Sequence, residues 1–438
     1  MSQQTDSPTL NQDAALSVAT ALLDRARLGA ALGKGFGGDR DYYQALGYPR
    51  TLTFDHYLAQ YSRHPVAGKA VDYPAMQTWR THPDVVDGDT AKHKTNTRFA
   101  RAWRTLATSL RLWHYCERTD RLAGIGEYAI LVIGTRGGAL GEQAPAIMSP
   151  ADLLYFRPYS QGDVTAITYD MDQASPRFGL PLLYTVNLGT VGAQTLGARQ
   201  VHFSHVVHVA EDTLTDEVFG RPRLQRPYNL LDDIIKIAGG SAEATWKLVY
   251  KGAVIAARDG FDIADSATDL AEKADEYIHG LRRVLTLQGA DLNVLGGEAI
   301  DPSGIWHVLE RLVSAATDIP ARLLFGSERG ELASSQDQEN YAAVIQARRE
   351  RFAEPVLVRP LVDWMLAHSV IPQPSSGQYA VVWPSAYQAG DAEIVDMNLT
   401  RAQTAEILAK VYDRTAAAEV AGFSSDVAAK LVGGAPPE

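Results

Sequence analysis

The stretch from residue 335 to residue 368 constrains the fold most, because its pattern predicts one unusually long helix. Ser335 and Gln338 stand in the spacing of a capping box, which marks a helix start. Apolar residues then recur at intervals of three and four: Tyr341, Val344, Ile345, Phe352, Val356 and Leu357. Pro355 and Pro360 predict a kink, because proline removes a backbone hydrogen bond and forces a bend. At ~1.5 Å per residue such a helix would span about 50 Å, which favours an elongated subunit whose neighbours cover it.

Two further helices are predicted upstream of this one. The first covers residues 227–250 and opens at a proline, which suits a first helical turn. The second covers residues 301–318, with Asp301 as its cap, and it stops before Pro320 because the residue preceding a proline avoids the α region. In both helices apolar residues recur every three to four positions, so each helix should bury one face.

The segment between these helices, residues 251–300, resembles an insertion between two long helices. It contains two strand-like runs, Val284–Leu287 and Leu292–Leu295. It also carries a series of acidic side chains: Asp259, Asp262, Asp265, Asp269 and Glu272. An acidic insertion that ends in strand-like runs is therefore expected here.

The rest of the chain divides into a helical part, a β-rich part and a tail. Residues 53–121 have a helical pattern, and β-branched and aromatic runs predict strands at 128–133, 153–156, 164–169, 182–186 and 201–207. A last strand is predicted at 379–384, followed by a helical region. Residues 1–52 form an arm whose Gly33–Gly38 run lacks the preceding strand and the Lys-Ser/Thr pair of a phosphate loop. The fold class is α+β.

Composition excludes several classes of protein. The 438 residues carry a formal charge of −11, which argues against a protein that coats nucleic acid, since that needs clustered Lys and Arg. Cys116 stands alone, so an internal disulfide and a thiolate metal site are excluded, and synthesis in a reducing cytoplasm is expected. No run approaches the ~18 apolar residues of a membrane span. A soluble protein is predicted.

Catalytic motifs are sparse, so the sequence favours a protein that is not an enzyme and binds no metal or cofactor. His202, His205 and His208 are spaced by three, and in a strand His205 would face away from the other two. His202 and Ser204 match half of a phosphodiesterase pattern whose second His-x-Ser/Thr does not occur in the chain. The adjacent Asp232 and Asp233 suit a solvated helix face better than a catalytic pair.

One block of sequence resembles the portal proteins of tailed bacteriophages. It consists of a helix that stops at Asp318-Ile319-Pro320, a Leu324-Phe325-Gly326 turn, a short polar loop with glycine, and the long helix that follows. Residues 200–208 resemble the family's His-x-Ser-Arg-Val strand. Residues 220–224 resemble its helix entry, although Pro222-Arg223 stands where the family has serine.

The resemblance, which spans about residues 50–420, implies a subunit of a ring, usually of twelve, at one vertex of the capsid. Carried over by order, it implies the following parts: an N-terminal arm (1–52), a wing that is helical and then β-rich (53–226), stem helix 1 (227–250), an α/β clip (251–300), stem helix 2 (301–318), a channel loop (319–334), a long kinked wing helix (335–378), and a helical crown with the C-terminal tail (379–438).

The resemblance also implies partners and site residues. The ring would be a head-to-tail connector in the virion, contacting the major capsid protein, the terminase large subunit, neck or adaptor proteins, and double-stranded DNA without sequence specificity. The acidic clip residues would dock the packaging motor. The channel loop would present Arg322, Ser327, Glu328, Arg329, Gly330 and Glu331. Arg322 and Arg329 suit phosphate contacts, or equally surface positions and ion pairs with Glu328 or Glu331.

Two other functions remain open from the sequence alone. One is a phosphohydrolase or cyclic-nucleotide phosphodiesterase that uses His202 and Ser204. The other is a different ring-forming capsid adaptor.

For a channel that DNA must traverse without sticking, an acidic lining is expected, because it repels phosphate.

Overall fold

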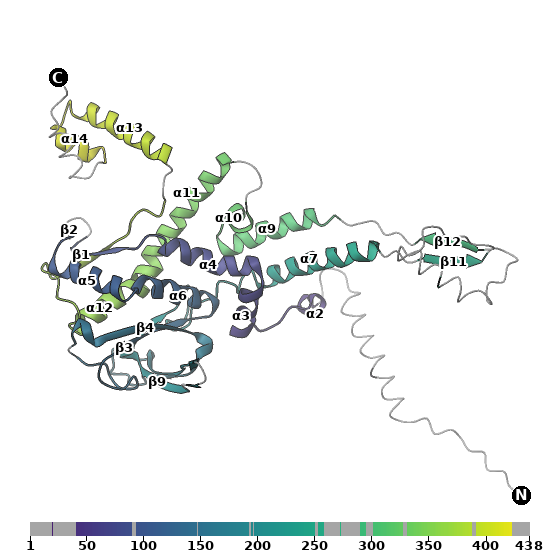
Figure 1. The fold of residues 1–438 in the computed structure, drawn as a ribbon, viewed down its shortest axis with the longest axis horizontal. Coiled ribbons are helices and arrows are strands. Elements are labelled where there is room, and N and C mark those ends of the chain that lie inside the picture. The colour runs from purple at the N-terminus through teal and green to yellow at the C-terminus, as the bar shows by residue number, and fades with distance from the viewer. Residues whose placement is uncertain are drawn as a thin grey trace, which may run out of the picture.

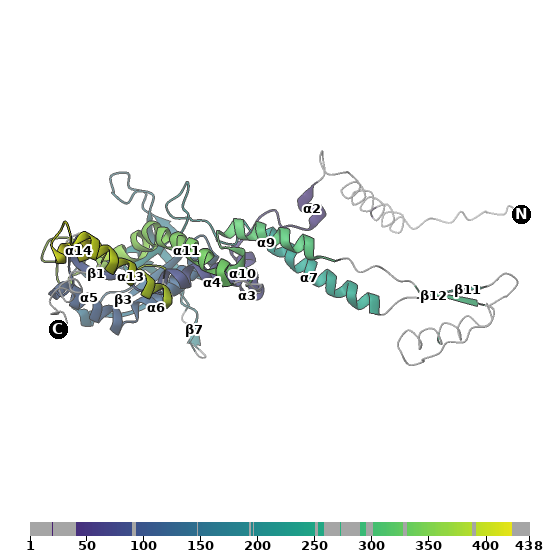
Figure 2. The same ribbon diagram turned by 90° about the horizontal axis from the view of Figure 1, so that it is seen from above.

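The computed structural model describes residue 20, residues 41–89, 93–146, 148–191, 194–195, 197–249, 253–257, 272, 290–294, 301–326, 331–387 and 391–422. These residues form a broad mixed α/β body from which the helices α7 (Tyr228–Val249) and α9 (Ser303–Thr317) extend side by side as a stem (Figures 1 and 2). The paired strands β11 (Ala253–Ala257) and β12 (Ala290–Val294) lie beyond the far end of the stem (Figure 1). The helices α13 (Asp391–Leu408) and α14 (Arg414–Val420) lie at the opposite end of the molecule. No helix in the described ranges is long and apolar enough to span a membrane.

Four helices form the helical layer of the body: α3 (Phe54–Arg63), α4 (Pro65–Trp79), α5 (Arg98–Ser109) and α6 (Leu112–Ile125). Pro65 occupies the first turn of α4, and the His64 ring accepts hydrogen bonds from the backbone N–H groups of Val66 and Ala67, which caps the helix. Buried aromatic side chains, including Trp79, Phe99 and Trp103, fix α4 and α5 against the sheets.

The helical layer also contains a strand that the sequence pattern did not reveal. β1 (Asp84–Gly88) lies between α4 and α5 and pairs with β13 (Tyr379–Val382) and with β2 (His93–Lys94). The prediction of a wholly helical stretch over 53–121 is therefore wrong at β1. β13, which opens the predicted C-terminal unit, is hydrogen-bonded to β1 of the body.

The β-rich part consists of two three-stranded antiparallel sheets and a two-stranded ribbon. In the first sheet β3 (Ala129–Thr135) lies between β10 (Val206–Val209) and β4 (Leu153–Ser160). In the second, β6 (Pro181–Asn187) lies between β5 (Val164–Tyr169) and β9 (Ala198–His202). The ribbon is β7 (Thr190–Val191) with β8 (Gln194–Thr195). The single strand predicted at 201–207 is wrong, because a 3₁₀ turn at Phe203–His205 separates β9 from β10 and sends them into different sheets.

The long helix is present and crosses the body (Figure 1). It begins at Glu331 as α11 (Glu331–Arg348), continues as a π-helical segment (Arg349–Val358) and ends as α12 (Arg359–Ala367). The predicted start at Ser335 is therefore wrong by a full turn. Pro355 lies within the π-helical segment, where its missing N–H interrupts regular α-helical hydrogen bonding, and Pro360 lies in the first turn of α12.

The stem helices are α7 (Tyr228–Val249) and α9 (Ser303–Thr317), close to the bounds that the sequence predicts. α9 ends where Asp318 adopts a left-handed conformation (φ 54°), and α10 (Ala321–Phe325) follows immediately. Asp301 caps α9 as predicted, since its carboxylate accepts a hydrogen bond from the N–H of Ser303 at 3.0 Å. The segment 319–334 is thus not simply a loop, because it contains α10 and the first turn of α11.

The remaining elements lie around the stem and at the C-terminal side. β11 (Ala253–Ala257) pairs with β12 (Ala290–Val294) in antiparallel fashion. β12 overlaps the predicted run at 292–295, the run at 284–287 lies outside the described residues, and β11 was not anticipated. α2 (Tyr42–Leu46) belongs to the arm, and α13 (Asp391–Leu408) and α14 (Arg414–Val420) follow β13. The Gly33–Gly38 run lies outside the described residues.

Candidate subunit-contact surface and the charge cluster at its base

The inner faces of the stem helices are packed against each other and against the body. Leu231 and Ile234 of α7 meet Leu309 and Val313 of α9 in a buried apolar cluster that also includes Ile319. Burial of apolar surface stabilises such a pairing by roughly 25 cal/mol per Å². One apolar side of each helix is therefore packed within the subunit.

A second side of α9 is apolar and exposed. Ile305, Val308 and Leu312 are spaced by three and four residues, so they form one stripe along the helix. Val308 is 56% and Leu312 47% exposed. We call these three residues the α9 stripe.

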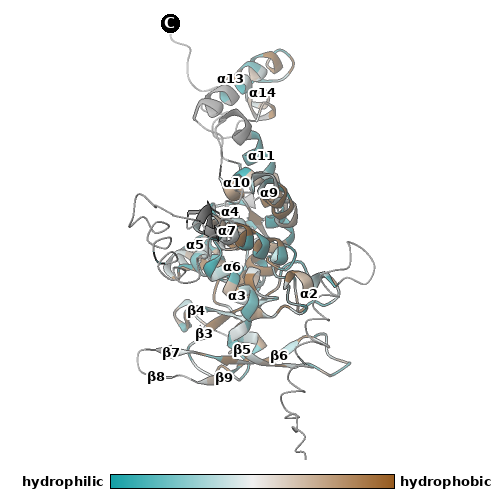
Figure 3. Cartoon of the chain, turned by 90° about the vertical axis from the view of Figure 1, so that its right-hand side faces the viewer, coloured by the Kyte–Doolittle hydropathy of each residue, from teal (hydrophilic) through white to brown (hydrophobic). Residues whose placement is uncertain are grey.

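A corresponding stripe lies on α7. Ile235, Ala238, Ala242 and Trp246 are exposed and recur at helical spacing, and Trp246 is 65% exposed. We call these four residues the α7 stripe. Both helices carry hydrophobic stretches when the molecule is viewed along the stem (Figure 3). Exposed apolar stripes on neighbouring elements indicate protein contacts.

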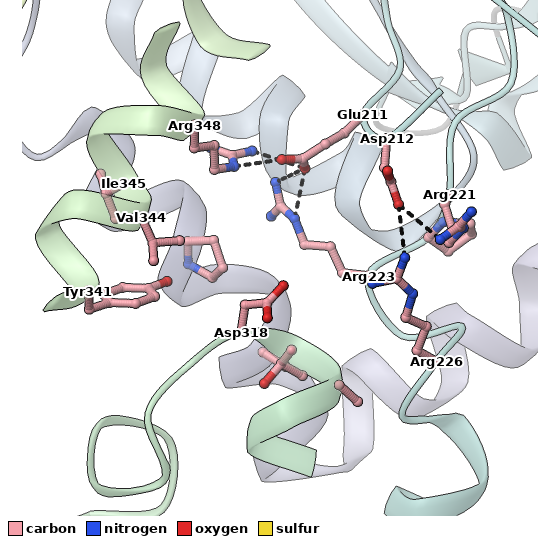
Figure 4. A pocket seen from close by; sticks show the side chains of 15 residues that line it. Glu211, Asp212, Arg221, Arg223, Arg226, Asp318, Tyr341, Val344, Ile345 and Arg348 are labelled. Atoms are coloured by element: carbon pink, nitrogen blue, oxygen red, sulfur yellow. Dashed lines mark hydrogen bonds and ion pairs between the residues drawn. The ribbon is translucent and has the colours of Figure 1, made fainter. Parts of the chain in front are cut away.

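At the base of the stem, four charged side chains form a largely buried cluster, which we call the charge cluster: Asp120, Glu211, Arg223 and Arg348. Arg348 donates to Glu211 Oε1 and Asp120 Oδ1 at 2.6 Å each. Arg223 donates to Asp120 Oδ1 at 2.6 Å and to Glu211 Oε2 at 2.5 and 3.0 Å. Figure 4 shows both guanidinium groups converging on Glu211. The cluster is formally neutral, which a buried group of charges requires.

Each member of the charge cluster comes from a different part of the fold. Asp120 lies on α6, Glu211 follows β10, Arg223 precedes α7, and Arg348 ends α11. Further bonds extend the cluster into α4: Arg223 donates to the Val71 carbonyl at 2.7 Å, and Arg348 donates to Thr78 Oγ1 at 2.6 Å. The cluster therefore joins the stem entrance, the long helix and both layers of the body.

The pKa values of the two acids reflect these contacts. Burial by itself would raise the pKa of Asp120, but the Arg348 and Arg223 guanidinium groups outweigh burial and lower this pKa to about 2. Burial by itself would also raise the pKa of Glu211, but the same two arginines lower this pKa below its usual value. Both acids are therefore ionised at neutral pH.

The neighbouring Arg349 is fully buried and performs a different task. Its guanidinium donates to the carbonyls of Thr78 at 3.0 Å and Gln77 at 3.3 Å, at the C-terminal end of α4. It also donates to the Pro384 carbonyl at 2.9 Å. A cation at a helix C-terminus is favoured by the helix dipole and by the free carbonyls there. Arg349 thus fixes the junction between α11 and the π segment onto α4.

A cavity of about 310 Å³ opens beside the charge cluster (Figure 4). Tyr341, Val344 and Ile345 of α11 line one side, and the C-terminal end of α9 lines another. At its rim Arg221 and Arg226 share Asp212 as a partner, at 3.3 and 3.7 Å. The cavity thus lies where stem and body meet, with an apolar wall and a rim of paired charges.

The family model for phage portal proteins matches residues 55–407 of this chain. The chain belongs to the phage portal protein family. The resemblance noted in the sequence is thereby confirmed. Portal proteins are structural components of the virion at a capsid vertex, so this portal protein is not an enzyme. No curated protein matches the chain.

Solved structures share the mixed α+β fold of this chain. The chain is similar to a chain in the neck of a native gene transfer agent (GTA) particle computed with C12 symmetry, at 12% identity and a TM-score of 0.51, covering 86% of this chain and 94% of that one. It is also similar to one in the neck of an empty GTA particle computed with C6 symmetry, at 14% identity and a TM-score of 0.50, covering 88% and 93%.

The residues predicted for the channel are only partly described. Arg322 lies on α10 and is exposed, and Glu331 begins α11. Ser327, Glu328, Arg329 and Gly330 lie outside the described residues. Of the acidic residues predicted to dock the motor, Glu272 is helical and exposed. Asp259, Asp262, Asp265 and Asp269 lie outside the described residues.

The histidines of the β-rich part hold the backbone in place rather than forming a site. His205 Nδ1 lies 3.2 Å from the Ile133 carbonyl, and His208 Nε2 lies 2.7 Å from the Val218 carbonyl. Within the described residues no group of three or more potential ligands could hold a metal ion.

The pair considered for phosphodiesterase chemistry stabilises the turn between β9 and β10. His202 Nδ1 lies 2.8 Å from Ser204 Oγ, and Ser204 Oγ accepts the N–H of Ala144 at 2.8 Å. These contacts, like the family assignment, favour a structural role. The alternative of a different capsid adaptor is also replaced by the portal assignment.

The acids Asp232 and Asp233 of α7 are not merely solvated. The Tyr48 hydroxyl donates to Asp233, and Lys236 Nζ lies 2.7 Å from Asp232 Oδ2. Lys236 also donates to the Leu46 carbonyl at 2.7 Å. These contacts attach the arm to the base of the stem, a role that short-range sequence patterns did not indicate.

Proposed function

We propose that twelve copies of this portal protein form a closed ring through which double-stranded DNA enters and leaves the capsid. The family assignment supports the role at the vertex. The C12 symmetry of the GTA neck in which a similar fold occurs supports the number.

One observation carries the proposal: the two stem helices bear different apolar stripes. A closed ring needs a heterologous interface, in which one patch of a subunit binds a different patch of the next. The α7 stripe and the α9 stripe lie on separate helices, and both present exposed apolar side chains, with Ile235 52% and Val308 56% exposed. Pairing the α7 stripe of one copy with the α9 stripe of the next would bury both and repeat around the ring.

The parts of the subunit follow from the same arrangement. We assign α7 and α9 to the stem, β11 and β12 with the residues between them to the clip, and the described body to the wing, including β13. The connection from α10 to α11 would line the narrowest part of the channel, with Arg322 and residues 327–331 beside it. α13 and α14 would form the crown.

The partners are assigned on the same basis. The clip, with its acidic residues at 259, 262, 265, 269 and 272, would dock the terminase large subunit and later the neck or adaptor proteins. The wing would face the major capsid protein. The net charge of −11 per subunit, repeated around the ring, would keep DNA from adhering along most of the channel.

A double substitution tests the ring. In Val308→Glu/Leu312→Glu the α9 stripe becomes charged, and we expect electron micrographs and native mass spectrometry to show monomers in place of rings. The melting temperature of the monomer should change little, because both side chains are exposed. Met171→Glu, at a position 75% exposed on the wing, is the matched control and should leave rings intact. Rings of normal size in the double variant would contradict the proposal.

A further inference from the structure

The β3–β4 loop, residues 140–146, is held against the turn between β9 and β10. The Leu140 carbonyl accepts a hydrogen bond from the His202 N–H at 2.7 Å. Ser204 Oγ accepts one from the Ala144 N–H at 2.8 Å. The His202 ring positions Ser204 in turn, because its Nδ1 lies 2.8 Å from Ser204 Oγ and accepts the Ser204 N–H at 3.3 Å. A nitrogen that accepts hydrogen bonds carries no proton, so this arrangement requires a neutral His202.

The other end of the β3–β4 loop is held by His368, the residue that follows α12. His368 Nδ1 lies 2.7 Å from the Pro145 carbonyl and donates to it. The His368 carbonyl accepts the Met148 N–H at 2.9 Å. The imidazole ring also lies against the indole ring of Trp364, with the ring centres 4.5 Å apart. Histidine side chains on two separate elements therefore fasten this loop to the body.

A third histidine, His205, lies buried in the same turn and is only 1% exposed. Its Nδ1 lies 3.2 Å from the Ile133 carbonyl, and its Nε2 is buried without a hydrogen-bond partner among the described residues. A neutral ring suits this position, since a proton on Nε2 would be an unsatisfied buried donor. Burial lowers the pKa of His205, and His202 and His368 lower it further, whereas the nearby carbonyl groups of Ile133 and Glu142 oppose this. We call these three residues the latch histidines.

The charged groups around the latch histidines do not compensate for their protonation. The Arg177 guanidinium lies over the Phe203 ring, next in the chain to His202, with Cζ 3.7 Å from the ring centre. Burial lowers the pKa of His202, and Arg177 lowers it further. Glu142, the acid of the β3–β4 loop, has an exposed side chain, and in the described part of the chain no carboxylate forms an ion pair with a latch histidine. Acid therefore adds positive charge beside an existing cation.

We propose that the latch histidines hold the β3–β4 loop in place at neutral pH and release it as the solution becomes acidic. The released loop binds more protons than the held loop, because the folded chain keeps the pKa of His202 and His205 below the ordinary value of 6.5. The stabilisation is therefore complete above about pH 6.5 and is lost as pH falls below that value. A proton on His202 Nδ1 also removes the acceptor of the Ser204 N–H. The inference does not depend on the proposed ring.

Amide hydrogen exchange of the full chain, followed from about pH 7.5 down to about pH 5, tests the latch. We expect the protection of the Ala144 and Met148 amides, corrected for the intrinsic exchange rate, to fall with pH. The fall should be about ten-fold per pH unit for each histidine that takes up a proton on release. The Ser375 and Ser376 amides, which donate to the Asp87 carboxylate, are the control. Burial alone would raise the pKa of Asp87, but these hydrogen bonds hold it far below its usual range, so their protection should stay constant.

A matched pair of variants assigns the effect to the histidines. In His202→Asn/His368→Asn each side-chain amide can replace the hydrogen bonds of Nδ1 without taking up a proton. The loop should stay held at neutral pH, and its protection should fall less steeply than in the native chain. His307→Asn, at a position 64% exposed on α9, is the control and should show the native slope.

Two results would overturn the inference. One is a native loop whose protection stays as constant over this pH range as that of the Ser375 and Ser376 amides. The other is a double variant whose protection falls as steeply as that of the native chain. If the double variant does not hold the loop even at neutral pH, the native loop measured against the control amides decides.

Discussion

The base of the stem and its outer surface are stabilised in opposite ways. At the base, Asp120, Glu211, Arg223 and Arg348 satisfy one another within a single subunit. Farther out, the α7 stripe and the α9 stripe remain exposed to solvent. The difference indicates that the contacts at the junction of stem and body are complete within one subunit, whereas the stem helices keep apolar surface that the proposed ring would bury.

Removing a member of the charge cluster should have the largest effect on the isolated subunit. Arg348→Ala leaves Arg223 as the one cation of the charge cluster facing Asp120 and Glu211, and loss of one partner from a buried ion pair costs about 3–5 kcal/mol. Urea unfolding of the monomer measures this loss. Arg136→Ala, whose side chain is 69% exposed, should change the free energy of unfolding by less than about 0.5 kcal/mol. Equal effects of the two substitutions would show that the cluster does not hold the junction together.

Two truncations on α7 compare its inner and outer faces directly. Leu231→Ala creates a cavity at a fully buried position and should cost about 2–5 kcal/mol in the monomer. Ile235→Ala, on the α7 stripe, should cost the monomer less than about 1 kcal/mol, and it should weaken rings. Thermal unfolding of dissociated subunits and the ring fraction at a fixed concentration measure the two effects. If Ile235→Ala destabilised the monomer as much as Leu231→Ala, the stripe would be part of the subunit core.

Lowering the pH should destabilise the junction of stem and body by less than the substitutions at Arg348 and Leu231 do. The pKa of Asp120 is about 2 in the folded chain, below its ordinary value of 3.8, so its contribution is complete above pH 4 and is lost as pH falls towards 2. A shift of this size corresponds to about 2 kcal/mol. Melting temperatures from neutral pH down to pH 2 should fall less steeply for Asp120→Asn than for the native chain. Glu217→Gln, at an exposed position, is the control and should show the same fall in melting temperature with pH as the native chain. If Asp120→Asn also matched the native chain, the charge cluster would not contribute to the dependence of stability on pH.

Much of the fold could be predicted because local signals and tertiary packing agree. The ends of α9 follow from the Asp301 cap and from the proline after Ile319, and the body strands follow from β-branched runs. Where local signals are weak, the prediction failed. Asp84–Gly88 is too short and too polar to read as a strand, and it forms β1 only because β13, almost 300 residues later, pairs with it.

The site was less predictable than the fold. The exposed stripes contain ordinary helical apolar residues, and the sequence does not distinguish a side that packs within the subunit from a side left for a neighbour. The sequence analysis also did not predict the charge cluster, although two adjacent arginines, Arg348 and Arg349, in a helix with an apolar face are a signal of buried charge. The partners of Arg348 lie more than 100 residues away, so only the tertiary structure reveals them.

The separation of the charge cluster along the chain has a consequence for biosynthesis. Asp120 and Arg348 lie 228 residues apart, so the cluster cannot close until most of the chain has left the ribosome. Both apolar stripes lie before Arg348 and are therefore translated first. During this interval a nascent subunit exposes adhesive helices without a finished junction to hold them, which is the situation in which chains aggregate or engage chaperones. Fragments that end between α9 and Arg348 should therefore be more harmful to assembly than shorter ones.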